Sequence, residues 1–160
     1  MHATIKPPSI TECPHEATAI RGFLHLIQLF KPFDDTFVGL WNQSLDKCDA
    51  DWIVSLQQQL EGALPQYLDS TENQTVDLRT SQQWLKIMIW QLSISQKLLS
   101  SKAENSALTL RFPIELSRKM VAEAGQFQRE AMEVHGIGLI KKVKSVSLWA
   151  DTISKHRTDF

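Results

Sequence analysis

The sequence of 160 residues contains little cysteine, and its two cysteines lie far apart. Cys13 and Cys48 could pair with each other, or join His15 and His25 at a zinc ion. No C-x-x-C or H-x-x-x-H pair, however, holds metal ligands at the usual spacing. We therefore expect no metal site, and reduced thiols in an intracellular compartment.

Long apolar runs and an excess of basic charge are also absent. No run approaches the roughly 18 apolar residues that a membrane helix needs, and the N-terminal sequence lacks the apolar core of a secretory signal. Seventeen basic residues stand against eighteen acidic ones. A nucleic-acid binder usually has a basic excess, because phosphate contacts supply most of its affinity. The sequence predicts a soluble protein with no membrane span and no direct DNA contact.

The patterns that indicate catalysis are missing too. No glycine-rich phosphate loop occurs, since the HGIG stretch has neither a strand before it nor a Lys-Ser or Lys-Thr pair after it. A nucleophilic cysteine would have to be Cys48 beside His25 or His135. The acidic neighbours of Cys48 are expected to raise the pKa of its thiol rather than lower it. We therefore do not expect an enzyme.

Apolar residues recur every three or four positions along most of the chain, which is the pattern of amphipathic helices. Leu56, Leu60 and Leu64 follow one another at intervals of four, and Pro65 then disfavours helical geometry. The segment 76–101 has apolar residues around most of its circumference, so we expect it to be the central, most buried helix. Strand-like alternation never persists. The sequence predicts an all-α fold of about six helices, at residues 16–31, 34–45, 49–65, 76–101, 112–136 and 138–154.

The chain is expected to form one helical domain with a short tail. Residues 1–14 are polar and contain prolines, so they are predicted to be a flexible segment, and residues 15–160 a single domain. Within the domain, residues 69–75 and 100–108 are loops by composition. Gly136 is predicted to stop the helix before it.

Polar side chains interrupt the apolar segment 76–101, and they allow two interpretations. Buried amides cost free energy unless they are hydrogen-bonded. Either these residues form one exposed strip, or Gln91 and Trp90 line a cavity for a small polar ligand. We favour the exposed strip, because a pocket needs convergent polar groups that one helix cannot show. The interrupting residues are Gln83, Gln91, Ser93, Ser95 and Gln96.

Several blocks of the sequence, in a fixed order, carry a resemblance to a known family. Residues 56–65 have the form L-x-x-x-L-x-x-x-L-P, and a short loop and a long aromatic-rich helix follow. With FLHLIQLFKPFDDTFVGLWNQ, FPIELSRKMV and AMEVHGIGLIKKV, these blocks cover most of residues 20–150. The chain resembles the C-terminal half of the regulatory, or middle homology, region of fungal transcription factors of the binuclear zinc cluster class. Among these it looks most like regulators of sugar and polysaccharide utilisation genes.

Two features of that class are missing. The six closely spaced cysteines that hold two zinc ions in the DNA-binding domain do not occur, so the resemblance implies no cofactor in this chain. The leucine-histidine-arginine-proline stretch after the long helix is replaced by ISQKLLSS. Since the regulatory region usually spans several hundred residues, we expect a fragment of one or a truncated relative.

The resemblance implies the effector-response and self-association part of a regulator of carbohydrate-utilisation genes. It implies a nuclear location, with a cytoplasmic inactive state as the alternative. The implied partners are other domains of the regulator, a co-regulator protein, a second copy in a homodimer, or a small metabolite or sugar effector. We predict a ligand site at Trp84, Trp90 and Gln91, and partner contacts at Trp41 and Trp149. The alternative is a stand-alone helical adaptor that uses an exposed apolar patch and has no small-molecule ligand.

Overall fold

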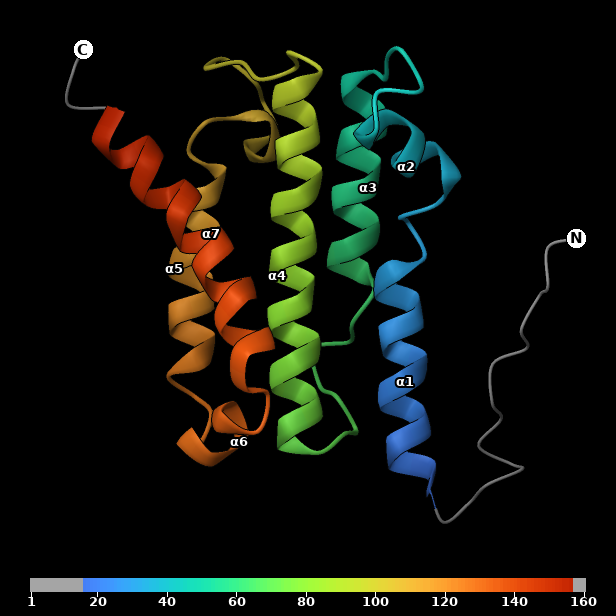
Figure 1. The fold of residues 1–160 in the computed structure, drawn as a ribbon, viewed down its shortest axis with the longest axis vertical. Helices are drawn as coiled ribbons and strands as arrows, with labels where there is room; N and C mark the ends of the chain where they lie inside the picture. The colour runs from blue at the N-terminus through green and yellow to red at the C-terminus, as the bar shows by residue number, and fades with distance from the viewer. Residues whose placement is uncertain (1–15, 157–160) are drawn as a thin grey trace, which may run out of the picture.

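The computed structural model describes residues 16–156, and in this range the chain forms α-helices, one short 3₁₀ helix and no strand (Figure 1). The all-α prediction is therefore confirmed, with seven α-helices in the described range. The predicted flexible segment 1–14 lies outside the described residues. The elements are α1 (Ala17–Phe30), α2 (Asp35–Trp41), α3 (Ala50–Gly62), α4 (Glu72–Ser95), η2 (Ser106–Leu108), α5 (Phe112–Ala124), α6 (Arg129–Glu133) and α7 (Gly136–His156).

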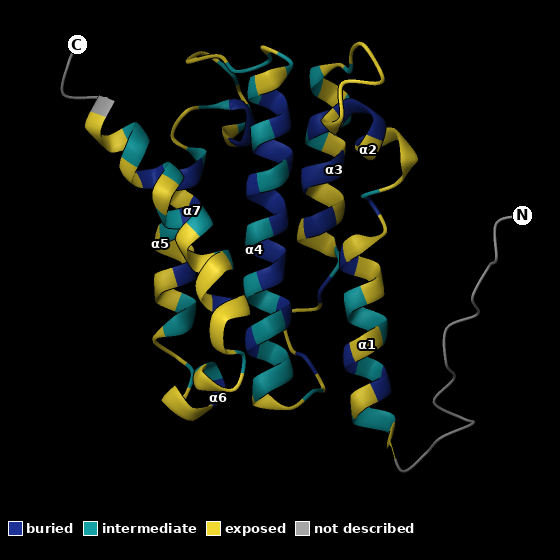
Figure 2. Cartoon of the chain, viewed as in Figure 1, coloured by how far each residue is buried: buried dark blue, intermediate teal, exposed yellow. Residues whose placement is uncertain are grey.

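Helix α4 occupies the centre of the fold, as the sequence predicts. It packs against α1 and α3 on one side and against α5, α6 and α7 on the other (Figure 1). Figure 2 shows buried and half-buried residues around its circumference. Ile87, Ile89 and Trp90 have no exposed surface at all. A helix covered on every side needs apolar residues on every side, which explains the continuous apolar character of this segment.

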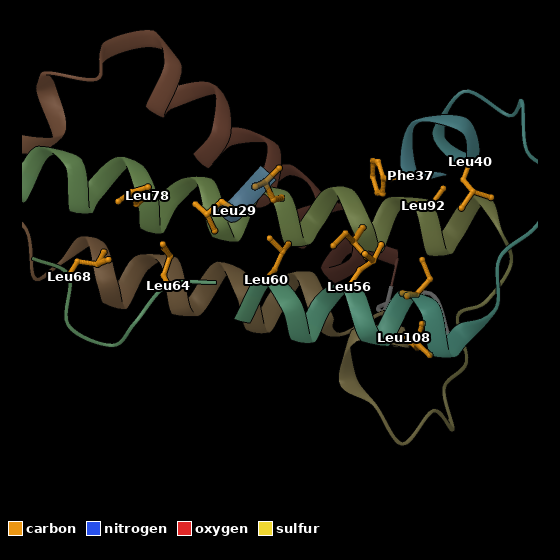
Figure 3. Packing of buried hydrophobic residues seen from close by; sticks show 13 residues of the cluster. Leu29, Phe37, Leu40, Leu56, Leu60, Leu64, Leu68, Leu78, Leu92 and Leu108 are labelled. Carbon is orange, nitrogen blue, oxygen red and sulfur yellow. The ribbon is translucent and has the colours of Figure 1, made fainter. Parts of the chain in front are cut away.

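The apolar core divides into clusters on the two sides of α4. The larger cluster fills the space between α1, α2, α3 and α4, and it includes the predicted stripe of Leu56, Leu60 and Leu64 (Figure 3). Burying each such side chain stabilises the fold by roughly 1.5–3 kcal/mol. On the other side, Ile87 of α4 packs in one cluster with Met120 of α5 and Val146 of α7. The interval-of-four stripe is therefore bundle core.

Capping chemistry moves the start of α4 ahead of its predicted position. The Thr71 hydroxyl accepts a hydrogen bond from the backbone N–H of Gln74 at 3.3 Å, and the Gln74 amide oxygen accepts one from the backbone N–H of Thr71 at 3.2 Å. This reciprocal pair is a capping box. The prediction of a loop over residues 69–75 is therefore wrong from Glu72 onward, where α4 begins. At the other end, α4 stops at Ser95 rather than at the predicted residue 101, and Lys97 has a φ of 59°.

The single helix predicted for residues 112–136 is wrong, because the chain turns after α5. Phe127 and Met132 pack beside Val76 near the start of α4, and this tertiary contact outweighs the local helical periodicity. Gly136 has a φ of +48°, a backbone conformation that residues other than glycine rarely adopt. The chain changes direction there between α6 and α7, in agreement with the predicted break.

No helix within residues 16–156 combines the length and the apolar character that crossing a membrane requires.

Candidate functional site in a polar groove between three helices

A layer of polar side chains crosses the apolar packing around α4. Gln57 and Glu61 lie one turn apart on α3 and therefore share a face of that helix, as Lys119 and Glu123 do on α5. Four of the seven side chains are at most 7% exposed, although they are amides or an ammonium. We call the seven residues the polar layer: Gln57 and Glu61 of α3, Gln82, Gln83 and Lys86 of α4, and Lys119 and Glu123 of α5.

Hydrogen bonds tie the polar layer together across the three helices. Lys86 Nζ donates to one carboxylate oxygen of Glu61, and Lys119 Nζ donates to the other at 3.2 Å. Gln83 Nε2 donates to the Glu123 carboxylate at 3.3 Å. Glu61 therefore bridges a lysine of α4 and a lysine of α5.

Lys86 carries its charge in an unfavourable environment. Burial, followed by the nearby positive charge of Lys119, lowers the pKa of Lys86 to about 8, against the opposing effect of the Glu123 carboxylate. Its main ion-pair partner, Glu61, has a side chain that is 60% exposed. A buried ion pair of this kind is weak evidence of stabilisation, since desolvation offsets most of the attraction. The ion pair with Glu61 therefore offsets only part of the cost of burying the Lys86 charge.

Two acceptor atoms of the polar layer are buried without a hydrogen bond. Gln57 Nε2 donates to the backbone oxygen of Lys86 at 2.9 Å, but its Oε1 has no partner among the described residues. The Oε1 of Gln83 is unpartnered in the same way. Each such atom costs about 1–3 kcal/mol. Buried polar atoms in folded proteins usually have a hydrogen-bond partner, from the protein or from water.

A groove of about 700 Å³ opens beside the polar layer, between the end of α3, residues 63–71, α4 and α5. Arg79 holds one wall in place, since its Nη2 donates to the backbone oxygens of Pro65 at 2.5 Å and Gln66 at 2.9 Å. The rings of Tyr67 and Phe127 also line the groove. Its volume lies within the range of small-molecule sites. We call this region the polar groove.

A second cavity, of about 260 Å³, is almost entirely apolar and lies between α1, α2 and α4. Phe33 and Phe37 meet edge to face at 4.5 Å between ring centroids, and Phe37 stacks on Trp41 at 5.8 Å. Trp41 is 40% exposed. We call this cavity the aromatic groove; its lining residues are Phe30, Phe33, Phe37, Val38, Trp41, Asn42, Trp84, Leu85 and Met88.

Four of the five predicted site residues meet in two separate pairs, Trp41 with Trp84 and Trp90 with Trp149. Trp41 and Trp84 both line the aromatic groove. Trp90 is fully buried on another face of α4, where its indole N–H donates to the Thr109 backbone oxygen at 2.9 Å and its ring meets half-buried Trp149 edge to face at 5.4 Å. Gln91 is half-buried. It stands seven residues, or about two helical turns, after Trp84, so the two side chains lie on about the same face of α4. The ligand and partner roles of these five residues stay predictions.

The interpretation of the polar residues of α4 as one exposed strip is wrong for Gln83 and Ser93. Both are fully buried. Gln83 Nε2 donates to Glu123 of α5, and the Ser93 hydroxyl donates to the backbone oxygen of Trp90 at 2.7 Å, so each side chain has a hydrogen-bond partner inside the fold. Sequence reasoning also missed Gln57 and Lys86. The signal for Gln57 was present, because helical spacing places it on one face between Ile53 and Leu60, where an apolar residue would continue the stripe.

The residues considered for catalysis and metal binding do not form a cluster in the described range. Burial raises the pKa of the Cys48 thiol, and the Asp49 carboxylate raises it further, while a backbone hydrogen bond acts in the opposite direction. His135 Nε2 lies 2.6 Å from the backbone oxygen of Asn73 at the start of α4, whereas Cys48 comes shortly before α3 in the chain, and α3 and α4 begin at opposite ends of the bundle (Figure 1). Among residues 16–156, no three His, Cys, Asp or Glu side chains could share a metal ion. Cys13 and His15 lie outside the described residues.

Comparison with known proteins shows weak similarity along nearly the whole chain. The maltose fermentation regulatory protein MAL13 of Saccharomyces cerevisiae is 23% identical over 159 residues, which is 98% of this chain and 33% of that protein. The respiratory transcription factor ZNF1 of the same organism is 20% identical over 159 residues, 98% of this chain and 34% of that protein. The probable sucrose utilization protein SUC1 of Candida albicans is 25% identical over 133 residues, 80% of this chain and 26% of that protein.

No family model and no solved structure matches the chain. The chain spans about a third of the length of the first curated relatives that it matches. The resemblance inferred from the order of sequence blocks is confirmed: the chain is weakly homologous to fungal zinc-cluster regulators of maltose, sucrose and respiratory genes.

Proposed function

We propose that this chain is the effector-response part of a fungal transcription regulator of carbohydrate-utilisation genes. The observation that carries the regulatory part of the proposal is the similarity to maltose fermentation regulatory proteins, which covers 98% of this chain. In this proposal the chain acts by binding rather than by catalysis. It holds no cofactor, contacts no DNA itself, and works in the nucleus with the DNA-binding part of the regulator.

The aromatic groove supports a role in binding another part of that regulator. Its exposed rim continues along α1, where Phe23, Ile27 and Phe30 follow at intervals of four and three and are 40–48% exposed. Extended apolar patches on a protein surface mark interaction sites. The relatives are about three times as long as this chain, so a regulator of that size has further chain to cover the patch. A co-regulator protein or a second copy of the chain is the alternative occupant.

The polar groove supports the effector-response half of the proposal. It combines a suitable volume with polar side chains from α3, α4 and α5, and one of them, Glu123, accepts the hydrogen bond of buried Gln83. The polar layer also crosses the packing between α3, α4 and α5. A ligand that changes the layer can therefore change how these helices pack, and such a change is what an effector-response domain has to transmit.

A reporter experiment tests the proposed function. The chain is fused to an unrelated DNA-binding domain, and transcription of a reporter is measured in yeast with and without maltose or sucrose in the medium. We expect the fusion to change reporter output relative to the DNA-binding domain alone, and the change to depend on sugar. An output equal to that of the DNA-binding domain alone under every condition would contradict the proposal.

The stand-alone adaptor is the second candidate, and the exposed aromatic groove is the observation that favours it. An adaptor would bind its partner equally well with and without sugar. Measuring the affinity of the chain for the rest of the regulator under both conditions separates the two functions.

A further inference from the structure

We propose that the polar groove binds a neutral, hydroxyl-rich molecule of about one or two sugar rings, held by Glu61 and Glu123 and by the amides of Gln66 and Gln126. This inference rests on the proposed function and deepens it, since it assigns the effector site and the chemical class of the effector.

The charges that line the polar groove cancel. Glu61 and Glu123 contribute two negative charges, and Arg79 and Lys119 contribute two positive ones. Glu61 is already paired with Lys119 and with buried Lys86. An anion would have to displace Glu61 from its two lysines, and a cation would meet Arg79, Lys119 and buried Lys86 against only two carboxylates. A neutral ligand avoids both penalties.

The remaining polar groups suit hydroxyls. The side chains of Gln66 and Gln126 are exposed and make no hydrogen bond within the described residues, so each offers two donor hydrogens and an acceptor oxygen. A carboxylate has about four acceptor sites, and Glu61 uses two oxygens for one lysine each. A hydroxyl both donates and accepts, so a polyhydroxylated molecule can satisfy amides and carboxylates together.

Two rings provide the apolar surface that such a ligand also needs. Tyr67 is 84% exposed, and Phe127 is half-buried against the base of α4. A sugar ring presents C–H groups between its hydroxyls, and small-molecule sites combine aromatic walls with a few placed polar groups. Tyr67 stands out because nothing in the described chain covers this large side chain.

The groove is connected to the interior through Glu123. This carboxylate lines the groove and accepts the hydrogen bond of Gln83, whose Oε1 is buried and unpartnered. A ligand hydroxyl on Glu123 is therefore one hydrogen bond away from an unsatisfied atom of the central helix. Occupancy of the groove can change the packing of α4 against α5 by this route.

The test is a titration of the isotope-labelled 160-residue chain, followed by amide NMR. The neutral probes are maltose, sucrose and glucose, and glucose 6-phosphate is the anionic probe of matched size. We expect at least one neutral sugar to shift the amide signals of residues 63–71 and 119–127, with an affinity at least about tenfold higher than that of the phosphate. Tighter binding of the phosphate, or no shift with any neutral sugar, would overturn the proposal.

Matched glutamine variants locate the site. Gln66→Ala and Gln126→Ala remove exposed side chains that make no hydrogen bond in the fold, so both variants are expected to fold. Each should raise the Kd for the neutral sugar by about tenfold, the usual effect of one lost hydrogen bond. Gln58→Ala is the control, because Gln58 is exposed on α3 and does not line the groove. Equal Kd values for all three variants and the unmodified chain would overturn the assignment.

Failure of this inference can be told apart from failure of the proposed function. A fusion that regulates the reporter while the chain binds none of the neutral sugars contradicts the groove assignment alone. A chain that binds sugar in the groove but leaves reporter output unchanged contradicts the regulatory function alone.

Discussion

Lys86, in the middle of the central helix, donates its charge-assisted hydrogen bond to Glu61 of α3, and the two side chains are 6% and 60% exposed. A buried cation thus reaches a partner that is mostly in water. Water screens that partner, so the pair returns only part of the desolvation cost of Lys86. The relationship ties the core of the bundle to the groove at its surface, and it can be tested through stability.

Replacing Lys86 with methionine should reduce the change in the free energy of unfolding between about pH 8 and pH 10.5. The pKa of Lys86 is lowered from 10.5 to about 8, mainly by burial and then by Lys119, while Glu123 opposes the shift. Between these values the unfolded chain binds more protons than the folded chain, so the contribution of Lys86 to the unfolding free energy rises with pH. The full rise is on the order of 3 kcal/mol. Below about pH 8 the Lys86 amine is protonated in both the folded and the unfolded chain, so the folded chain bears the full cost of burying that charge.

Urea unfolding of the unmodified chain and of Lys86→Met at about pH 7 and about pH 10 provides the measurement. The difference between the two proteins cancels the titration of the other groups. We expect Lys86→Met to be as stable as the unmodified chain, or more stable, at neutral pH, and to lose that advantage at the higher pH. A difference that does not change with pH would contradict the prediction.

The packing of Trp90 gives a second prediction. Trp90→Phe removes the hydrogen bond to the Thr109 backbone oxygen and part of the edge-to-face contact with Trp149. We expect a loss of about 2 kcal/mol in unfolding free energy, from the unsatisfied carbonyl and the smaller ring. Trp84→Phe, at the half-exposed wall of the aromatic groove, should cost less than about 1 kcal/mol. Equal losses in urea unfolding would show that the two faces of α4 are not packed as described.

The capping box at the start of α4 gives a third prediction. Thr71→Ala removes the side-chain acceptor for the backbone N–H of Gln74 and should lower stability by about 1 kcal/mol. Thr71→Ser keeps the hydroxyl and should restore most of the loss. A serine variant as unstable as the alanine variant would assign the effect to the methyl group of threonine rather than to the cap.

The aromatic groove gives a fourth prediction, which concerns partner binding. Trp41→Ala should weaken association with the rest of the regulator at least tenfold, since tryptophan is enriched among the hot spots of interfaces. Leu148→Ala is the control, because Leu148 is 66% exposed on α7 and does not line this groove. Affinities can be measured by surface plasmon resonance, and sedimentation tests a second copy as partner. Unchanged association in Trp41→Ala would remove the aromatic groove from the account.

Local periodicity predicted much of the fold but not its breaks. The interval of four from Leu56 to Leu64 identified a real core stripe, because helical spacing places those side chains on one face. The early start of α4 at Glu72 was missed because a polar stretch was interpreted as a loop, although Thr71 and Gln74 form a cap. The turn after α5 depends on contacts of Phe127 with α4, and one-dimensional periodicity contains no such information.

The polar layer could not be predicted, because its residues come from three helices. Gln83 was recognised as a polar residue in an apolar helix, but nothing in the sequence places it beside Glu123 of α5. Lys86 and Glu61 are likewise brought together only by the packing of α3 on α4. Trp41 and Trp84, predicted for different roles, meet in one groove for the same reason. Convergence of side chains is a property of tertiary structure.

The most direct test of the account is the sugar response of the reporter fusion with and without an intact polar groove. The account predicts that the unmodified fusion responds to the neutral sugar bound by the isolated chain, and that Gln66→Ala with Gln126→Ala moves the response to a sugar concentration at least about tenfold higher. The Gln58→Ala fusion should respond as the unmodified fusion does. A groove variant that responds at the same sugar concentration as the unmodified fusion would contradict the account.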